Sequence, residues 1–287
     1  MNVNDKTGDM GTIDTNGASP IKNVLSIGGS DPSGGAGIQA DLKTFAANGV
    51  YGMAVISALT AQNTCGVKAI HCPDPGFVEA QIDCLFDDIQ PAAVKIGMLA
   101  NADIIRRVAA RLKHYRASNI VVDPVMLSSS GQRLLDPDAV DTLIHELLPI
   151  ARLYTPNLDE GACLLESKLP ESRQDMLIMA EQLQALGQCS ALLKGGHLPG
   201  SESPDVLVDK AASSHWFCSR RIDTPNKHGT GCTLSAAIAA NLACNNADLA
   251  DAVTSAKNYL TQALAGAGEL DVGTGAGPLH HFVDLWP

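Results

Sequence analysis

Short apolar runs alternate along this chain with longer segments whose apolar residues recur every three to four positions. The apolar run at residues 24–27 is followed by a segment in which Ile38, Leu42 and Phe45 have this spacing. A short apolar run bounded by turn residues is typical of a buried strand, and the wider spacing is typical of an amphipathic helix. Because strands that alternate with helices form a mainly parallel sheet covered on both faces, the sequence predicts an α/β fold.

The same alternation continues along the chain and predicts its organisation. Further strands are expected at residues 51–59, 93–98, 120–122, 153–157 and 191–194. Helices are expected at residues 78–89, 101–112, 136–148, 158–166, 172–186 and 247–266, with another directly after Cys232. Asn101 and Asp136 are the expected N-caps of two of them. A polar turn is expected at residues 60–64, and a hairpin of more exposed strands at residues 205–208 and 216–221.

Composition limits the domain count and the partners. Residues 1–20 are predicted to be a disordered tail and residues 21–287 one domain, since no linker or internal repeat divides them. The formal net charge of −11 argues against a nucleic-acid surface and against an anionic membrane. No apolar run approaches the about 20 residues of a membrane span, and no signal peptide is visible. The eight cysteines are dispersed without zinc-binding spacing, so reduced thiols in a cytoplasm are expected.

Polar residues and glycines collect where the predicted strands end. These residues are Gly29, Asp31, Gln62, Lys95, Met98, Asp123, Asn157 and Lys194. In open α/β sheets, ligands bind in the crevice outside the carboxyl ends of the strands. We therefore expect these residues to border one ligand-binding crevice.

Residues 226–237 combine a glycine-rich turn with the start of an apolar helix. Gly229 and Gly231 permit backbone conformations that a side chain would block. The helix is predicted to begin at Cys232 or Thr233, and its free first-turn N–H groups and positive dipole end would bind an anion. In that field the pKa of the Cys232 thiol is expected to fall below the free value of about 8.5. The alternative is a plain tight loop with a cysteine that packs as a small apolar residue.

Seven segments, in this order, carry a resemblance to a known family. They are residues 29–45, 58–64, 95–99, 123–126, 155–160, 194–197 and 228–233, the last of which reads His-Gly-Thr-Gly-Cys-Thr. The set resembles the bacterial hydroxymethylpyrimidine/phosphomethylpyrimidine kinases of thiamine biosynthesis, within the ribokinase-like superfamily. The resemblance spans about residues 22–284 and implies a ribokinase-like three-layer α/β/α fold with a mainly parallel central sheet.

The resemblance implies a kinase that uses ATP and Mg²⁺ and that often forms a homodimer. The γ-phosphate of ATP would pass to 4-amino-5-hydroxymethyl-2-methylpyrimidine, and a second transfer would convert the monophosphate to the diphosphate. Cys232 would occupy the general-base position held by aspartate in much of the superfamily. The backbone amides of Gly229, Thr230 and Gly231 would stabilise the charge of the transferring group.

The resemblance also assigns the remaining site residues. The pyrimidine pocket would be formed by Gln62, Gly29, Asp41, Met98 and Val125. The nucleotide would be bound by Lys194, Asn157, Glu160 and His228, and Mg²⁺ would be held through phosphate or water by Asp123 and Glu160. Some of these residues have structural alternatives: Asn157 and Glu160 could simply cap a helix, and Asp41 could be an exposed helix residue.

One departure from the family and two rival functions complete the sequence-based hypothesis. Where the family often has Ala-Lys-Ser-Gly-Asp, residues 128–132 read Ser-Ser-Ser-Gly-Gln, so that a lysine contact to the monophosphate is missing at Ser129. Pyridoxal kinase of the same superfamily is the first rival, and the turn around Gln62 together with Cys232 favours the pyrimidine over it. A nucleotide- or vitamin-binding protein without catalysis is the second, and the intact Asn157, Glu160 and Lys194 argue against it.

Overall fold

The computed structural model describes residues 20–127, 131, 133–245 and 248–286. Residues 1–19 of the predicted tail lie outside the described residues, and so does Ser129, where the family lysine is replaced. In the described part of the chain, no helix is both long enough and apolar enough to cross a membrane.

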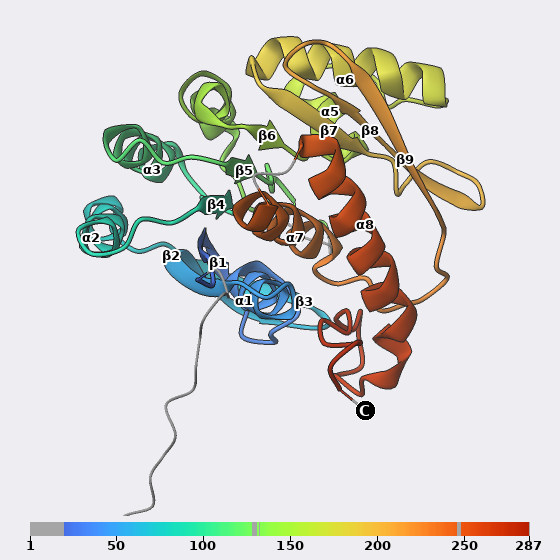
Figure 1. Cartoon of the computed structure of the whole chain (residues 1–287), viewed down its shortest axis with the longest axis horizontal. Helices are drawn as coiled ribbons and strands as arrows, with labels where there is room; N and C mark the ends of the chain where they lie inside the picture. Colours follow the sequence, from blue (N-terminus) through green and yellow to red (C-terminus); the bar gives the residue numbers. More distant parts are fainter. Residues whose placement is uncertain (1–19, 128–130, 132, 246–247, 287) are drawn as a thin grey trace, which may run out of the picture.

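Within the described ranges, nine strands form one sheet in the order β3-β2-β1-β4-β5-β6-β7-β8-β9 (Figure 1). They are β1 (Asn23–Ser30), β2 (Tyr51–Asn63), β3 (Gly66–His71), β4 (Ala93–Ile96), β5 (Ile120–Val122), β6 (Leu153–Tyr154), β7 (Ser190–Lys194), β8 (Glu202–Val208) and β9 (Ser214–Arg220). Neighbouring strands from β2 through β7 pair in parallel, whereas β3, β8 and β9 pair antiparallel at the two edges. The predicted α/β fold with a mainly parallel sheet is confirmed.

Helices cover both faces of the sheet and give three layers (Figure 1). One face carries α1 (Gly37–Ala47), α7 (Thr230–Asn245) and α8 (Leu249–Ala265). The other carries α2 (Pro75–Phe86), α3 (Ala102–His114), α5 (Leu158–Leu164) and α6 (Arg173–Gly187). Asn101 caps α3 as predicted, because its side chain accepts the N–H of Ile104 at 3.0 Å.

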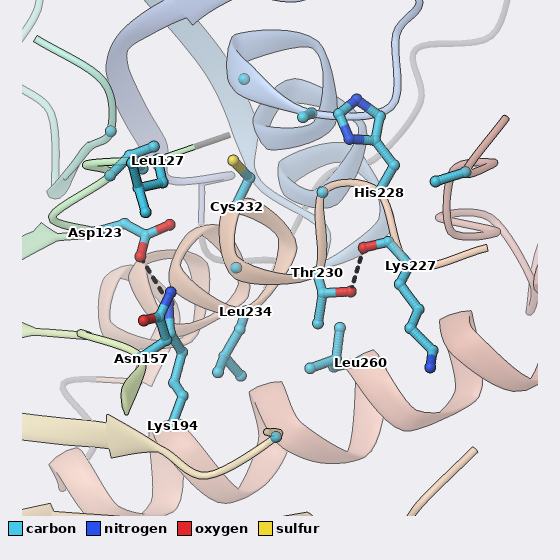
Figure 2. Close-up of a pocket in the computed structure, with 18 of the residues that line it drawn as sticks. Asp123, Leu127, Asn157, Lys194, Lys227, His228, Thr230, Cys232, Leu234 and Leu260 are labelled. Atoms are coloured by element: carbon cyan, nitrogen blue, oxygen red, sulfur yellow. Dashed lines mark hydrogen bonds and ion pairs between the residues drawn. The ribbon is translucent and has the colours of Figure 1, made fainter. Parts of the chain in front are cut away.

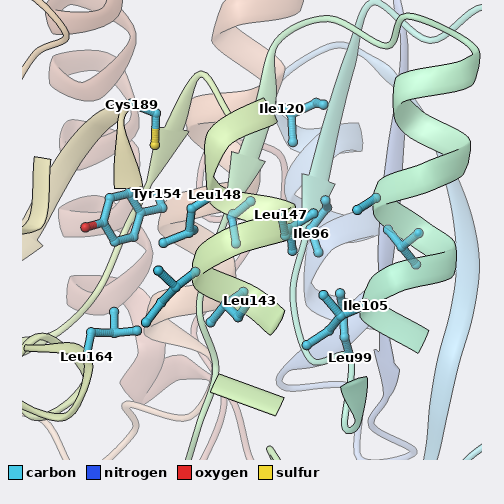
Figure 3. Close-up of a cluster of buried hydrophobic side chains, with 14 of the residues drawn as sticks. Ile96, Leu99, Ile105, Ile120, Leu143, Leu147, Leu148, Tyr154, Leu164 and Cys189 are labelled. Atoms are coloured by element: carbon cyan, nitrogen blue, oxygen red, sulfur yellow. The ribbon is translucent and has the colours of Figure 1, made fainter. Parts of the chain in front are cut away.

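Alternation along the strands divides the core into two clusters, since successive strand residues point to opposite faces. In β5, Ile120 and Val122 join the cluster under α2, α3 and α6, while Val121 joins the cluster under α1, α7 and α8. Figure 3 shows part of the first cluster, with Ile96 and Leu147 pointing toward each other across the layer boundary. Burial of these side chains, worth roughly 25 cal/mol per Å² of apolar surface, holds the layers together.

The helix predicted at residues 136–148 forms with mixed geometry. Pro137–Ala139 is a 3₁₀ turn, Val140–Thr142 is one α-helical turn (α4) and Leu143–Leu147 is a π-helical turn, before a last 3₁₀ turn. The π-helical turn buries all three of its apolar side chains in the core. Asp136 is the N-cap residue and Pro137 begins the first turn, as predicted, although the Asp136 side chain makes no capping hydrogen bond.

Two predictions about the sheet edges are also wrong. β2 continues through the expected polar turn to Asn63, because β3 pairs with it and supplies partners for its backbone groups. β8 is mostly buried instead of exposed, because it lies between β7 and β9. Only β9, which ends the sheet, shows the exposed pattern that the sequence predicts for this hairpin.

Candidate functional site

A cavity of about 740 Å³ lies at the carboxyl ends of the parallel strands. Its wall includes residues at the ends of β1, β4, β5 and β7, the first turns of α5 and α7, and one side of α8. Of the site residues predicted from the sequence, those that line it are Gly29, Gln62, Met98, Asp123, Val125, Asn157, Glu160, Lys194, His228, Gly229, Thr230, Gly231 and Cys232. The predicted crevice at the strand ends is therefore present, and of the predicted set only Asp41 is not on its wall.

The glycine-rich loop borders this cavity, and α7 begins within it (Figure 2). α7 starts at Thr230, earlier than predicted, so that Gly231 and Cys232 both lie in its first turn. Gly229 has φ of +86°, and a Cβ there would stand 1.9 Å from the carbonyl oxygen of Gly35, so this position requires glycine. Because first-turn N–H groups have no partner inside a helix, this turn is suited to binding an anion in the cavity.

A partly buried ion pair lies beside this turn (Figure 2). Lys194 Nζ is 2.9 Å from Asp123 Oδ1, which also accepts a hydrogen bond from Thr155 Oγ1 at 3.1 Å. A Cβ on Gly231 would be 3.2 Å from both Asp123 Oδ2 and Lys194 Nζ, so the backbone of the turn runs next to the pair. Burial by itself raises the pKa of Asp123, but the charges of Lys194 and Lys95 outweigh it and hold that pKa below its ordinary value.

Asn157 and Glu160 cap α5 and also border the cavity. Asn157 Oδ1 accepts the N–H of Glu160 at 2.8 Å, and the Glu160 carboxylate accepts the N–H of Asn157 at 2.8 Å. This capping box is the structural alternative that the sequence left open, and it is compatible with a role in the cavity. Burial raises the pKa of Glu160 to about 7; the charge of Lys194 opposes the shift and that of Asp123 adds to it. Glu160 therefore titrates near neutral pH.

A second wall of the cavity comes from β2 and from the loop after β1. Gln62 Nε2 is 3.2 Å from His228 Nε2, and this ring nitrogen is 2.8 Å from the Asp31 carboxylate. Asp31 also accepts the N–H groups of Ser33 and Ala36 at 2.9 Å each, and so holds the loop in shape. His228, predicted to bind the nucleotide, thus contacts the predicted pyrimidine residue Gln62.

The placement of Asp41 requires a correction. Its side chain is fully buried in α1, where it accepts hydrogen bonds from Lys95 Nζ at 2.8 and 2.9 Å and from Ser26 Oγ at 2.6 Å. It therefore neither reaches the cavity nor lies on the helix surface. Lys95 lines the cavity, as expected of a polar residue at a strand end, although no role was predicted for it. Its place inside the apolar run of β4 is a second signal, because an unpaired charge would not be buried there.

The pKa of Cys232 also differs from the expectation. Its pKa is raised to about 11, chiefly because the thiol is removed from water. The charge of Lys95 and the Gly37 N–H oppose this shift, and the charges of Asp41 and Asp123 add to it. The effect of burial on the pKa of the thiol therefore outweighs that of the start of α7. The prediction that the thiol is partly ionised at neutral pH is wrong.

Comparison with known proteins places this site in a family. A family profile described as phosphomethylpyrimidine kinase matches residues 31–280. The chain is 51% identical over 264 residues to the hydroxymethylpyrimidine/phosphomethylpyrimidine kinase of Escherichia coli strain K12, an alignment that covers 92% of this chain and 98% of that protein.

Solved structures show the same similarity. The crystal structure of phosphomethylpyrimidine kinase from Clostridium difficile 630 is 43% identical, covers 85% of this chain and 99% of its own, and has a TM-score of 0.74. An ADP complex of Bacillus subtilis pyridoxal kinase is 35% identical, covers 92% of this chain and 98% of its own, and has a TM-score of 0.83. The ribokinase-like fold that the sequence resemblance implies is thereby confirmed.

Proposed function

This chain belongs to the phosphomethylpyrimidine kinase family, and we propose that it uses ATP to phosphorylate hydroxymethylpyrimidine and then its monophosphate, as a step of thiamine biosynthesis. One observation carries this proposal: the first turn of α7 borders a cavity that has a charged wall and an uncharged one. The charged wall holds the Asp123–Lys194 pair. The uncharged wall is formed by Gln62, Met98 and Val125, and it adjoins the Asp31–His228 pair. The first wall suits phosphate groups and the second suits a small heteroaromatic ring.

The uncharged wall supports binding of the pyrimidine. The Gln62 side chain can donate to a ring nitrogen and accept from an exocyclic amine. Met98 and Val125 offer apolar contacts to the ring. A Cβ on Gly29 would stand 3.1 Å from Met98 Sδ, so any side chain at residue 29 would crowd this wall.

The charged wall supports binding of ATP. The side chain of Lys194 is 15% exposed, at the cavity, and it can contact a phosphate without leaving its place. Leu234 and Leu260 lie on the same side of the cavity as Lys194 (Figure 2), and they offer an apolar surface for a nucleotide base. Asn157 and Glu160 complete this wall.

Phosphoryl transfer asks the protein mainly to position the reactants and to stabilise charge. In the proposed reaction, the thiolate of Cys232 takes the proton of the pyrimidine's hydroxymethyl group. The hydroxymethyl oxygen then forms a bond to the γ-phosphorus of ATP, and ADP leaves. The amides at Gly229, Gly231 and Cys232 are suited to stabilising the negative charge of the transferring group, whereas that of Thr230 donates to the Lys227 carbonyl at 3.3 Å. With its pKa raised to about 11, Cys232 is a strong base once ionised, and the ionised fraction is small at neutral pH.

We further propose that Mg²⁺ acts with ATP at this site. Mg²⁺ prefers oxygen ligands and is usually held by one or two carboxylates together with phosphates and water. Among the described residues, no group of three or more His, Cys, Asp or Glu side chains could hold a metal by itself. The carboxylates of Asp123 and Glu160, both buried at the cavity wall, fit a metal that arrives with the nucleotide. When bound there, Mg²⁺ would neutralise phosphate charge.

A substrate panel tests this function. Purified protein is incubated with ATP and either hydroxymethylpyrimidine, its monophosphate or pyridoxal, and ADP release is measured. We expect both pyrimidines to have a clearly higher kcat/KM than pyridoxal. Pyridoxal kinase is the second candidate, because a pyridoxal kinase is a structural neighbour at a TM-score of 0.83. A preference for pyridoxal would favour it, and an absence of ADP release with all three would favour a binding protein without catalysis.

Three broader expectations belong to the same proposal. We propose that residues 21–287 act as one domain, which the shared nine-stranded sheet of the described residues supports. We also propose a cytoplasmic location, with which the eight free cysteines are compatible. The homodimer implied by the family resemblance is tested by light scattering of the purified protein.

A further inference from the structure

The glycine-rich segment at residues 275–281, which we call the strap, has no role in the function proposed above. It reads Gly-Ala-Gly-Pro-Leu-His-His and lies where the chain turns back toward β3 after α8 (Figure 1). All seven of its residues are described, and none of them lies in a helix or in one of the nine strands. The shape of the strap therefore depends on its contacts with other segments, and these contacts lie around the cavity.

The first contact of the strap is with the end of β2. The N–H of Ala276 donates to the Thr64 carbonyl oxygen at 3.0 Å, and the N–H of Gly275 donates to Thr64 Oγ1 at 3.2 Å. A Cβ on Gly275 would stand 2.1 Å from the Thr64 carbonyl oxygen, so an approach this close requires glycine. Thr64 follows β2 directly and is two residues beyond Gln62. The strap is thus joined to the strand that carries Gln62.

The second contact is with the loop that leads into the turn at residues 229–232. The N–H of His228 donates to the Gly277 carbonyl oxygen at 3.1 Å, and Asn226 Oδ1 accepts the N–H of Gly277 at 3.2 Å. Asn226 Nδ2 also donates to the carbonyl oxygen of Ala267, just after α8, at 2.8 Å. The Asn226 side chain therefore bridges this loop, the strap and the end of α8.

The third contact is inside the first turn of α7. His281 Nε2 is 3.1 Å from the hydroxyl of Thr233, the residue after Cys232, and both side chains are buried. The hydroxyl of Tyr259 on α8 donates to the His281 carbonyl oxygen at 2.8 Å and holds this end of the strap. Burial is the main cause that lowers the pKa of His281 to about 4, so its ring is uncharged near neutral pH. The contact with Thr233 is therefore the same throughout the neutral range.

The strap adds to a direct contact between the same two regions. Gln62 and His228 meet at 3.2 Å, and this single contact leaves the end of β2 free to rotate against the turn at residues 229–232. Contacts through the strap at Thr64, at Asn226 and at Thr233 remove that freedom. A displacement of about 1 Å between reacting groups is enough to lower a rate by about 100-fold.

We propose that the strap is a positioning element for phosphoryl transfer, which holds the end of β2 in a fixed place relative to the first turn of α7. The inference rests on the proposed function, in which Gln62 binds the pyrimidine and the turn at residues 229–232 binds the transferring group. The positioning residues are Asn226, Thr233 and His281. None of them is among the described residues that line the cavity, so each acts through its neighbours.

The first test removes the bridge at Asn226. In Asn226→Ala, kcat with hydroxymethylpyrimidine should fall about 10- to 100-fold, because the two substrates are no longer aligned. KM for ATP and KM for the pyrimidine should each stay within about threefold, because each substrate keeps its own wall of the cavity. Steady-state kinetics measure these values. A folded variant with wild-type kcat, or one in which the KM values rise while kcat is unchanged, would overturn the inference.

A matched control is available at the other end of the sheet. Asn119, which directly precedes β5, also makes a bridge: it donates to the Ala92 carbonyl oxygen at 2.9 Å and accepts from Arg152 Nη1 at 2.7 Å. Asn119→Ala removes a comparable pair of hydrogen bonds far from the strap. Its kcat should stay within about twofold of wild type. A fall in kcat equal to that of Asn226→Ala would overturn the inference, since any loss of stability would then explain both.

The second test uses a pair of substitutions at Thr233. Thr233→Val keeps the shape of the side chain but removes the hydroxyl that meets His281, whereas Thr233→Ser keeps the hydroxyl. Loss of one hydrogen bond in the valine variant should lower kcat about 3- to 10-fold, and the serine variant should stay within about twofold of wild type. The same kcat in both variants would overturn the role of His281.

Hydrogen exchange separates this inference from the proposed function. In protein without substrate, the backbone amides of residues 227–233 should exchange at least about tenfold faster in Asn226→Ala, because the strap supplies the acceptor of the His228 N–H. The amides of α5, at residues 158–164, should exchange at the wild-type rate. Unchanged exchange at residues 227–233 would overturn the inference. This measurement needs no reaction, so a wild-type protein that fails the substrate panel refutes only the proposed function.

Discussion

Two of the Asp–Lys pairs that lie at the cavity differ in how completely the protein encloses them. Lys95 and Asp41 share two hydrogen bonds at 1% and 0% exposure. Lys194 and Asp123 share one hydrogen bond, and the Lys194 side chain is 15% exposed at the cavity. The enclosed pair is a fixed source of charge, whereas Lys194 can turn donors toward a ligand. We therefore expect the difference in burial to give two pairs of the same chemistry different roles.

The Cys232 thiol, on which both pairs act, should show the largest effect. Cys232→Ala removes the proposed base but leaves the backbone amides, so kcat should fall by roughly 10²–10⁴ while KM values change little. Cys232→Asp should retain more activity than Cys232→Ala, since a carboxylate can also accept the proton. Steady-state kinetics of both variants measure this. Cys244→Ala, at an exposed position near the end of the same helix, is the control. Near wild-type kcat in Cys232→Ala would make this residue a packing thiol.

The next largest effect is expected on stability, when the lysine of either pair is replaced and its aspartate remains. Lys95→Met leaves the Asp41 carboxylate buried without its cation and should lower the free energy of unfolding by about 3–5 kcal/mol. Lys194→Met should lower it by only about 1–3 kcal/mol, because Asp123 keeps Thr155 as a donor and lies next to the cavity. Urea unfolding monitored by circular dichroism gives both values. Equal losses would show that the difference in exposure does not matter.

Between pH 8 and 10, the pH dependence of the reaction should reflect the ionisation of the Cys232 thiol alone. Both lysines have raised pKa values, because the charges of their partners outweigh the effect of burial, so they stay charged in the alkaline range. Glu160, with a pKa of about 7, is ionised above pH 8. The thiol, with a pKa of about 11, is still mostly protonated there, so kcat/KM should rise about tenfold per pH unit from pH 8 to 10. A flat profile would show that no thiolate is needed.

The affinity for ATP should depend on the Lys194–Asp123 pair, whose lysine is partly exposed at the cavity. Lys194→Met removes a charge-assisted contact worth about 1.5–3 kcal/mol, so KM for ATP should rise about 10- to 100-fold. The double variant Lys95→Met/Asp41→Asn should leave KM for ATP unchanged. Lys210→Met, at an exposed position, is the control for loss of a lysine. If both pairs changed KM for ATP alike, Lys194 would have no special access to the nucleotide.

The smallest effect is expected on the uncharged wall. Gln62→Ala removes neutral hydrogen bonds, each worth about 0.5–1.5 kcal/mol, so KM for the pyrimidine should rise about 3- to 10-fold and KM for ATP should not change. Initial rates with each substrate varied in turn measure this. Gln182→Ala, at an exposed position on α6, should change neither value. An unchanged pyrimidine KM in Gln62→Ala would remove Gln62 from the substrate site.

Local patterns along the sequence determined the layered fold and the place of the site. The alternation of strands and helices predicts the mainly parallel sheet, because periodicity reflects which face of an element is buried. The strand ends carrying Gln62, Asp123 and Lys194 meet at one cavity, as parallel strands require. The glycines around Thr230 predict the tight turn before α7, because only glycine fits at a position such as Gly229.

Only the tertiary structure decided the environment of individual groups. Asp41 and Lys95 are 54 residues apart in sequence, and Asp31 and His228 are 197 apart, so no local pattern could pair them. The pKa of Cys232 followed from burial and from charges on other elements, and these outweighed the helix start that the sequence displays. The burial of β8 and the extension of β2 likewise depended on neighbouring strands. Periodicity records which face of an element is buried, whereas desolvation and charge pairing depend on segments that folding brings together.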